Sequence, residues 1–226
     1  MQALLVIADI GGYTEFMRLH RMSIAHAQQN TDRLLRAVIE AAPKLRLVGL
    51  EGDAAFFWVP EPENAEVAST IAGLAARMHQ AFHDRKRQIE AVSVCRCDAC
   101  DQIGRLRVKF VAHIGEVVRQ KGRRATNIAG LDVIYVHRML KNGVPVPEYL
   151  LFSEPVLGRC DRAVQEQAVD IDEELEGVGV ERLHYLDLEL AALEATPVPA
   201  ATRADKLRHA ATMTAKSLPV LLGLRR

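Results

Sequence analysis

The chain has 226 residues, and its 29 basic and 29 acidic side chains give a net charge of zero. Hydrophobic residues make up 49% and charged residues 26%, which is typical of a soluble globular protein. The neutral balance argues against a dedicated nucleic-acid-binding protein. The longest early apolar run, Ala3 to Ala8, is too short to span a bilayer and lacks the basic residues that open a secretory signal. We therefore expect a cytoplasmic protein with reduced thiols.

The net charge of zero is the sum of segments that carry opposite charges. Arg105 to Arg124 carries a net charge of +6, Gln165 to Glu194 carries −9, and Arg203 to Arg226 carries +5. The sequence therefore predicts a basic middle, an acidic late segment and a basic tail.

The hydrophobic pattern alternates between strand and helix. In chain order it predicts a strand over 3–8, a helix over 23–42, a hairpin of strands over 45–50 and 54–59, a helix over 63–91, a strand over 106–114, a helix after Gly130, and strands over 149–152 and 178–188. The order β-α-β-β-α-β, followed by more helix and strand, predicts an α+β fold. Its core is ferredoxin-like, with helices packed on a largely antiparallel sheet and with C-terminal additions.

The last part of the chain is expected to lie outside this core. Residues 196–202, TPVPAAT, are typical of a linker, and a basic helix is predicted from Arg203 to about Ser217. We divide the chain into a domain over 1–190 and a linker with a basic helix over 191–226. The helix has Leu207, Ala211, Leu218 and Leu221 on an apolar side, which predicts contact with a partner or a membrane surface, unless it is a frayed terminus.

Two aspartates are candidates for binding a hard divalent cation. Asp9 ends the first strand and Asp53 lies in the hairpin turn, so the two carboxylates are expected to converge at one end of the sheet. Glu51, two residues before Asp53, is a possible third oxygen ligand. Oxygen ligands of this kind suit Mg²⁺ bound together with substrate phosphates. The alternative is that both aspartates only fill turn positions, as aspartate commonly does.

A glycine-rich loop directly follows Asp9. It reads Gly11-Gly12-Tyr13-Thr14 and precedes a helical segment, where exposed backbone N–H groups are able to hold phosphate oxygens. The alternative is a plain turn, because a Gly-Gly pair is common in turns.

Several motifs in this order resemble those of class III nucleotidyl cyclases. The segment Ala8 to Thr14 is similar to the family's D-I-x-G-[FY]-[ST] opening, and Gly52-Asp53 is similar to its second metal aspartate. His113 to Val118 resembles the strand motif H-x-G-x-V. Gly130, Val133 and Arg138 match the spacing of G-x-x-V-N-x-A-x-R. The resemblance covers roughly residues 1–160 and also extends to an uncharacterised branch of cyclase-like proteins.

The resemblance implies a homodimer with nucleotide sites at its interface. Asp9 and Asp53, with the backbone carbonyl of Ile10, would bind Mg²⁺ or Mn²⁺, with Ca²⁺ as a further option. These ions would hold a nucleoside triphosphate, and ATP is the first candidate. Gly11, Gly12, Tyr13 and Thr14 would hold the phosphates, and Arg138 would reach the site of the partner subunit as a catalytic residue. The reaction would join the ribose 3′-hydroxyl to the α-phosphorus and release pyrophosphate.

Three positions depart from the family pattern. Gly49 stands where the resemblance expects the adenine-selecting lysine, Asn127 matches a base-reading aspartate, and Ile134 replaces the asparagine that orients the ribose. An apolar isoleucine cannot form a hydrogen bond with a sugar. We therefore predict nucleotide and metal binding with weak or no turnover. The alternatives are an active cyclase in which Asn127 reads a different base, and a scaffold with a zinc-bound loop.

Three cysteines form a second candidate metal site. Cys95, Cys97 and Cys100 lie close together in an irregular loop, and thiolates at such spacing are able to bind Zn²⁺. The expected fourth ligand is Cys160, His113 or a residue of a partner chain. The alternatives are a loop with a purely structural role and a redox pair.

Overall fold

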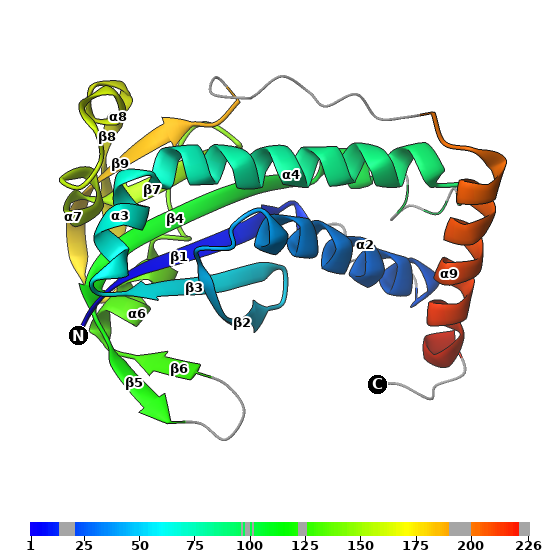
Figure 1. Ribbon diagram of the computed structural model, residues 1–226, viewed down its shortest axis with the longest axis horizontal. Helices are drawn as coiled ribbons and strands as arrows, with labels where there is room; N and C mark the ends of the chain where they lie inside the picture. The colour runs from blue at the N-terminus through cyan, green and yellow to red at the C-terminus, as the bar shows by residue number, and fades with distance from the viewer. Residues whose placement is uncertain are drawn as a thin grey trace.

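The computed structural model describes residues 1–13, 21–95, 97, 100, 102–121, 126–189 and 200–221. A seven-stranded sheet forms its centre, and β5 and β6 form a separate two-stranded sheet (Figure 1). The strands are β1 (Gln2–Gly11), β2 (Arg46–Glu51), β3 (Ala54–Pro60), β4 (Arg107–Glu116), β5 (Val118–Lys121), β6 (Thr126–Ala129), β7 (Tyr149–Ser153), β8 (Val169–Leu175) and β9 (Gly179–Asp187). The helices are α2 (Arg21–Glu40), α3 (Glu63–Ser69), α4 (Ile71–Val92), the 3-10 helix η1 (Ile103–Arg105), α6 (Leu131–Arg138), α7 (Glu154–Leu157), α8 (Arg162–Gln167) and α9 (Arg203–Leu221).

The first four strands of the main sheet are arranged as in a ferredoxin-like core. The order is β2-β3-β1-β4-β7-β9-β8, so β1 lies between β3 and β4 and is antiparallel to both. The order of the first four strands is that of a β-α-β-β-α-β core. Among the strand pairs of the described residues, β4 with β7 is parallel and the rest are antiparallel. The predicted α+β fold, a largely antiparallel sheet with helices packed on it, is confirmed.

Both faces of β1 are buried. Leu4 packs in a core cluster that contains Leu34 of α2, whereas Leu5 faces the opposite cluster, which contains Val136 of α6. A strand that is covered on both faces needs continuous apolar residues instead of an alternating pattern. This double coverage explains the unbroken apolar run over residues 3–8 and its correct prediction as a buried strand.

The predicted helix over 63–91 is two helices in the structure. It breaks at Thr70, whose φ of −110° lies outside the helical range. The Thr70 hydroxyl donates hydrogen bonds to the carbonyl oxygens of Glu66 and Val67, at 3.3 and 3.2 Å. Threonine side chains that bond to the preceding turn compete with the helical backbone, so the chain changes direction there between α3 and α4.

Strand β8 was not predicted, because its sequence Val169–Leu175 is mostly acidic. It is an edge strand and pairs in antiparallel register with β9, from Val169 opposite Tyr185 to Leu175 opposite Gly179. Backbone pairing with β9 stabilises it, although few of its side chains are buried. Edge strands of natural proteins often carry charged side chains, which oppose pairing with other chains.

The C-terminal helix α9 was expected to lie apart from the core, but in the structure it packs against α2 and α4. It crosses the far ends of α2 and α4 (Figure 1), and Met213 and His209 are buried there. Leu207 and Ala211 of the predicted apolar side are exposed, so contact with a partner or a membrane through them stays a prediction; the side chains of Leu218 and Leu221 lie outside the described residues. No helix in the described ranges is long and apolar enough to cross a membrane. The domain division at residue 190 stays a prediction.

Candidate functional site

The structure brings Asp9 and Asp53 together at the end of β1. Asp9 lies opposite Ala54 in the β1–β3 pairing, and the Ile10 N–H donates to the Asp53 carbonyl oxygen at 3.2 Å. The pKa of the Asp53 carboxyl is raised by its partial burial and then by the negative charge of Asp9. Two carboxylates that repel each other in a partly desolvated place are a favourable site for a cation. The sequence alone predicted their convergence.

Lys109 is a cation at this site that the sequence reasoning missed. It lies opposite Asp9 in the β1–β4 pairing, and its Nζ is 3.4 Å from Asp9 Oδ2 and 3.2 Å from the Leu140 carbonyl oxygen. Its positive charge also lowers the pKa of Asp53, against the larger effects of burial and Asp9. A lysine near the start of an otherwise apolar strand segment was the available signal, but the strand register was needed to place it against Asp9. Lys109 thus balances part of the charge of the aspartate pair.

The loop after Asp9 is described as far as Tyr13. Gly12 has φ +85°, a left-handed conformation that favours glycine, and this explains the residue at the turn. Burial raises the pKa of the Tyr13 hydroxyl, and the charge of Asp53 raises it further. Tyr13 therefore lies close enough to Asp53 for its charge to act on the Tyr13 hydroxyl. Thr14 lies outside the described residues, and the Ile10 side chain is buried, so Ile10 has only its backbone to offer.

Glu51 and Arg138 are held by other partners within the same chain. Glu51 Oε2 is 3.0 Å from His137 Nε2 of α6. The Arg138 guanidinium forms an ion pair with Glu176, in the turn between β8 and β9. The acidic late segment therefore meets the end of α6, and the contacts described for Glu51 and Arg138 do not join them to the aspartate pair.

Asn127 lies on β6, in the two-stranded sheet that projects away from the main sheet (Figure 1). Its backbone pairs with Gln120 of β5. The Asn127 side chain lies outside the described residues, so the structure gives only the position of its backbone.

The H-x-G part of the cyclase-like motif has a structural explanation. His113 Nδ1 is 2.8 Å from Ser153 Oγ, and its Nε2 is 3.2 Å from Asp132 Oδ1, in the first turn of α6. A side chain at Gly115 would clash, since a Cβ there would lie 2.2 Å from Asp132. His113 and Gly115 thus seat the start of α6 against β4, and His113 is engaged away from the cysteines.

The three cysteines meet a histidine from α2. His26 Nδ1 lies 3.7, 3.4 and 3.8 Å from the Sγ atoms of Cys95, Cys97 and Cys100. The four ligand atoms lie within 4.8 Å of one another. Burial, with the neighbouring thiols of Cys97 and Cys95, raises the pKa of Cys100 to about 12. A bound cation would relieve this crowding, because metal-bound thiols are deprotonated.

Two of the expected fourth ligands of this cluster, Cys160 and His113, lie away from it, and a ligand from a partner chain stays untested. Cys160 is buried elsewhere and bonds to the Val156 carbonyl oxygen at 3.3 Å, and His113 bonds to Ser153. His26 was missed because it precedes Cys95 by 69 residues and carries no local motif. Only the packing of α2 beside α4 brings it to the loop that follows α4.

A third group of titratable side chains is buried between α4 and the sheet. Glu148 accepts hydrogen bonds from the Val108 N–H at 2.9 Å, from His79 at 3.1 Å and from His83 at 2.9 Å. Burial acts to raise the pKa of Glu148, but these hydrogen bonds outweigh it and hold the pKa well below its usual value. Because each carboxylate oxygen already has partners, we interpret this group as a structural network.

Sequence comparison connects the chain with proteins whose function is not stated. A family model described as "Protein of unknown function (DUF2652)" matches residues 31–149, more than half of the chain. The protein Rv2561/Rv2562 of Mycobacterium tuberculosis (strain ATCC 25618 / H37Rv), described as uncharacterized, is 44% identical over 156 residues, which cover 69% of this chain and 72% of that protein.

Structural comparison finds nucleotidyl cyclases. The adenylyl cyclase CyaB from P. aeruginosa superposes with a TM-score of 0.59 at 14% identity, over 87% of this chain and 97% of that one. The guanylyl cyclase Cya2 gives 0.58 at 13% identity, over 89% and 98%. The catalytic core of a rhodopsin-guanylyl cyclase with converted specificity, in complex with ATPαS, gives 0.57 at 14% identity, over 82% and 95%. At these identities the likeness shows the fold alone.

Proposed function

Because the chain belongs to the family described as protein of unknown function (DUF2652) and has the fold of nucleotidyl cyclase domains, we propose that it binds a nucleoside triphosphate with a divalent metal ion. The observation that carries the proposal is the convergence of Asp9 and Asp53 at the end of β1. Their oxygens suit Mg²⁺ or Mn²⁺, and a bound ion would supply charge neutralisation for the phosphates. Gly11, Gly12 and Tyr13 follow directly and are the proposed phosphate contacts.

Lys109 gives this site a property of its own. Beside Asp9 it neutralises one carboxylate in the absence of metal, and its Nζ would leave Asp9 and the Leu140 carbonyl oxygen for a phosphate oxygen when a metal ion takes its place. A flexible lysine stem with three donors suits such an exchange. We therefore add Lys109 to the proposed nucleotide contacts.

We propose that the site is completed at a homodimer interface. Large apolar side chains are exposed on α6 and the neighbouring β5: Leu131 is 83%, Ile134 52% and Val118 67% exposed. Clustered exposed apolar residues mark interaction surfaces. A second copy covering this face would bring its own α6, and with it Arg138, toward the aspartates. Arg138 would have to leave Glu176 to act there.

Turnover is proposed to be weak or absent. Ile134 offers no hydrogen bond to a ribose, and Gly49 offers no side chain to a base. Phosphoryl chemistry of this kind depends on positioning, which contributes roughly 7–11 kcal/mol in favourable cases. The alternative function is an active cyclase with a changed base preference, and it keeps Asp9, Asp53 and Arg138 in the same positions.

Calorimetry with ATP and Mn²⁺ tests nucleotide binding. We expect the native chain and the control Asp172→Asn, on the exposed face of β8, to bind, and Asp9→Asn and Asp53→Asn to lose binding. Failure of the native chain to bind ATP, GTP, CTP or UTP with Mn²⁺ would overturn the proposal. A cyclic nucleotide that forms with the native chain and not with Asp9→Asn would favour the active cyclase.

Sedimentation tests the interface with a matched pair of variants. Leu131→Asp places a charge on the exposed apolar face of α6, whereas Leu207→Asp places it on α9, where the side chain is 71% exposed. We expect the native chain and Leu207→Asp to sediment as dimers and Leu131→Asp as a monomer. A native monomer at all concentrations, or equal behaviour of the two variants, would refute this interface.

We also propose that His26, Cys95, Cys97 and Cys100 bind one structural Zn²⁺. Three thiols and one imidazole are a common closed ligand set for tetrahedral zinc, and their proximity supports this proposal. The ion would tie the N-terminal half of α2 to the loop after α4. Elemental analysis of purified protein should find one zinc per chain, lost in Cys97→Ser and retained in Cys160→Ser; zinc-free protein would contradict the assignment.

A further inference from the structure

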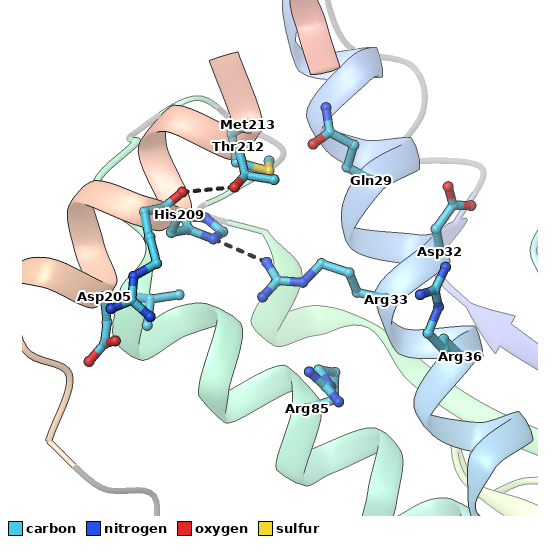
Figure 2. A pocket seen from close by; sticks show the side chains of 11 residues that line it. Gln29, Asp32, Arg33, Arg36, Arg85, Asp205, His209, Thr212 and Met213 are labelled. Carbon is cyan, nitrogen blue, oxygen red and sulfur yellow. Dashed lines mark hydrogen bonds between the residues drawn. The ribbon is translucent and has the colours of Figure 1, made fainter. Parts of the chain in front are cut away.

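A cavity of about 460 Å³ lies between α2, α4 and α9, on the side of the molecule away from the β5–β6 hairpin (Figures 1 and 2). Four arginines line it: Arg33 and Arg36 of α2, Arg85 of α4 and Arg208 of α9. Figure 2 shows Arg33 and Arg85 reaching into the same space from different helices. Such a volume is typical of small-molecule sites.

Among the described residues no carboxylate forms an ion pair with these arginines, although the charge of Arg208 contributes to the lowered pKa of Asp205. Two aspartates line the cavity, but Asp205 accepts hydrogen bonds from the Thr202 hydroxyl and N–H at 2.6 and 3.1 Å, at the start of α9. Asp32 lies one helical turn before Arg36 without forming an ion pair with it. In the part of the chain that the structure describes, none of the four guanidinium groups is paired with a carboxylate.

Arg33 and Arg85 are like charges forced together. The partner described for Arg33 is not an anion but an imidazole: its Nη1 lies 3.1 Å from His209 Nδ1. Burial lowers the pKa of Arg33, and the charge of Arg85 lowers it further. A partly buried cation without a counter-ion is unfavourable. The arrangement therefore reduces stability unless an anion occupies the cavity.

His209 adds a donor to the cavity. Burial lowers its pKa, and the neighbouring charges of Arg33 and His26 lower it further, which favours the neutral imidazole. With Nδ1 accepting a hydrogen bond from Arg33, the proton lies on Nε2, which is then a donor. The cavity thus combines fixed positive charge with a neutral donor.

We propose that this cavity binds the phosphate group of a small phosphorylated ligand, at a site separate from the aspartate pair. Guanidinium groups match the oxygen pairs of phosphate with two parallel hydrogen bonds. Four of them from three helices, against the two lining aspartates, leave two positive charges, which suit a dianion. Since Arg208 and His209 belong to α9, the bound ligand would also fasten α9 to α2 and α4.

Thermal unfolding with glycerol phosphate, in buffer without divalent metal, tests the proposal. Arg85→Gln removes one lining arginine, and Arg77→Gln is its matched control, an exposed arginine on the same helix outside the cavity. We expect glycerol phosphate to raise the melting temperature of the native chain, of Arg77→Gln and of Asp9→Asn. Calorimetry should give at least tenfold weaker binding for Arg85→Gln, the loss of one charged hydrogen-bond pair.

The same variants separate a binding role from a structural one. Without anion, Arg85→Gln should melt at or above the temperature of the native chain, because the repulsion on Arg33 is relieved. A lower melting temperature without anion, or equal stabilisation of Arg85→Gln and Arg77→Gln by glycerol phosphate, would overturn the proposal. Equal stabilisation by succinate would overturn the assignment to phosphate. Stabilisation of Asp9→Asn by glycerol phosphate would show that the anion binds at a place other than the nucleotide site.

Discussion

The main sheet and the cavity between α2, α4 and α9 differ in whether their charged side chains have partners of opposite charge. Around the sheet, opposite charges meet: Lys109 lies beside Asp9, Arg138 binds Glu176, and His79 and His83 bind Glu148. Between α2, α4 and α9, four arginines line one cavity without a carboxylate partner in the described ranges. The difference teaches that most charges around the sheet are balanced within the chain, whereas those of the cavity are not, which is why we propose a ligand there.

Removal of Glu148 should have the largest effect on stability. Glu148→Ala leaves His79, His83 and the Val108 N–H without their buried partner. Breaking a buried charged network costs about 3–5 kcal/mol. Chemical denaturation should show this loss for Glu148→Ala and a negligible change for Glu166→Gln on the exposed helix α8. A loss of stability below about 1 kcal/mol would contradict the view that the paired charges around Glu148 stabilise the fold.

Acid should reproduce part of this effect. The pKa of Glu148 is lower in the folded chain than its usual value of 4.5. The stabilisation is therefore complete above about pH 4.5 and is lost as the pH falls below this value. Glu148→Gln should have a flatter pH dependence of unfolding in this acidic range than the native chain; an unchanged slope would contradict the assignment.

Asp53 should behave in the opposite way. Its pKa is raised in the folded state by burial and by Asp9, so its ionisation destabilises the fold as the pH rises above its usual value of 3.8. Asp53→Asn should therefore gain up to about 1 kcal/mol at pH 7 without metal, a figure reduced for solvent screening. Denaturation of both proteins in metal-free buffer measures it. A destabilised Asp53→Asn would mean that the aspartate pair is structural, like the other pairs around the sheet.

The surface pair of Arg138 and Glu176 should have the smallest effect. Both side chains are partly exposed, and such pairs contribute about 0–1 kcal/mol. Glu176→Gln should unfold within this range of the native chain and bind ATP with Mn²⁺ at least as tightly, because Arg138 is released. Weaker nucleotide binding by Glu176→Gln would contradict the proposal that release of Arg138 from Glu176 favours nucleotide binding. Glu174→Gln, on the neighbouring strand, is the control.

Local patterns were enough to predict much of this fold and part of its site. The apolar runs predicted β1 and the β2–β3 hairpin, and the position of Asp9 and Asp53 at the ends of those strands predicted their convergence. Strand register and helix packing then decided the rest. The acidic strand β8 exists because β9 pairs with it, and the break at Thr70 comes from side-chain bonds that compete with the helix.

By itself the sequence determined most of the order of strands and helices, and it pointed to the aspartate pair and the cysteine group, because apolar periodicity, strand ends and cysteine spacing are properties of the chain itself. Only the tertiary structure placed Lys109 beside Asp9, His26 beside the cysteines, and Arg208 in one cavity with Arg33 and Arg85. These contacts join residues far apart in the sequence. Periodicity fixes which face of an element is apolar, but the position along a neighbouring element is set by packing.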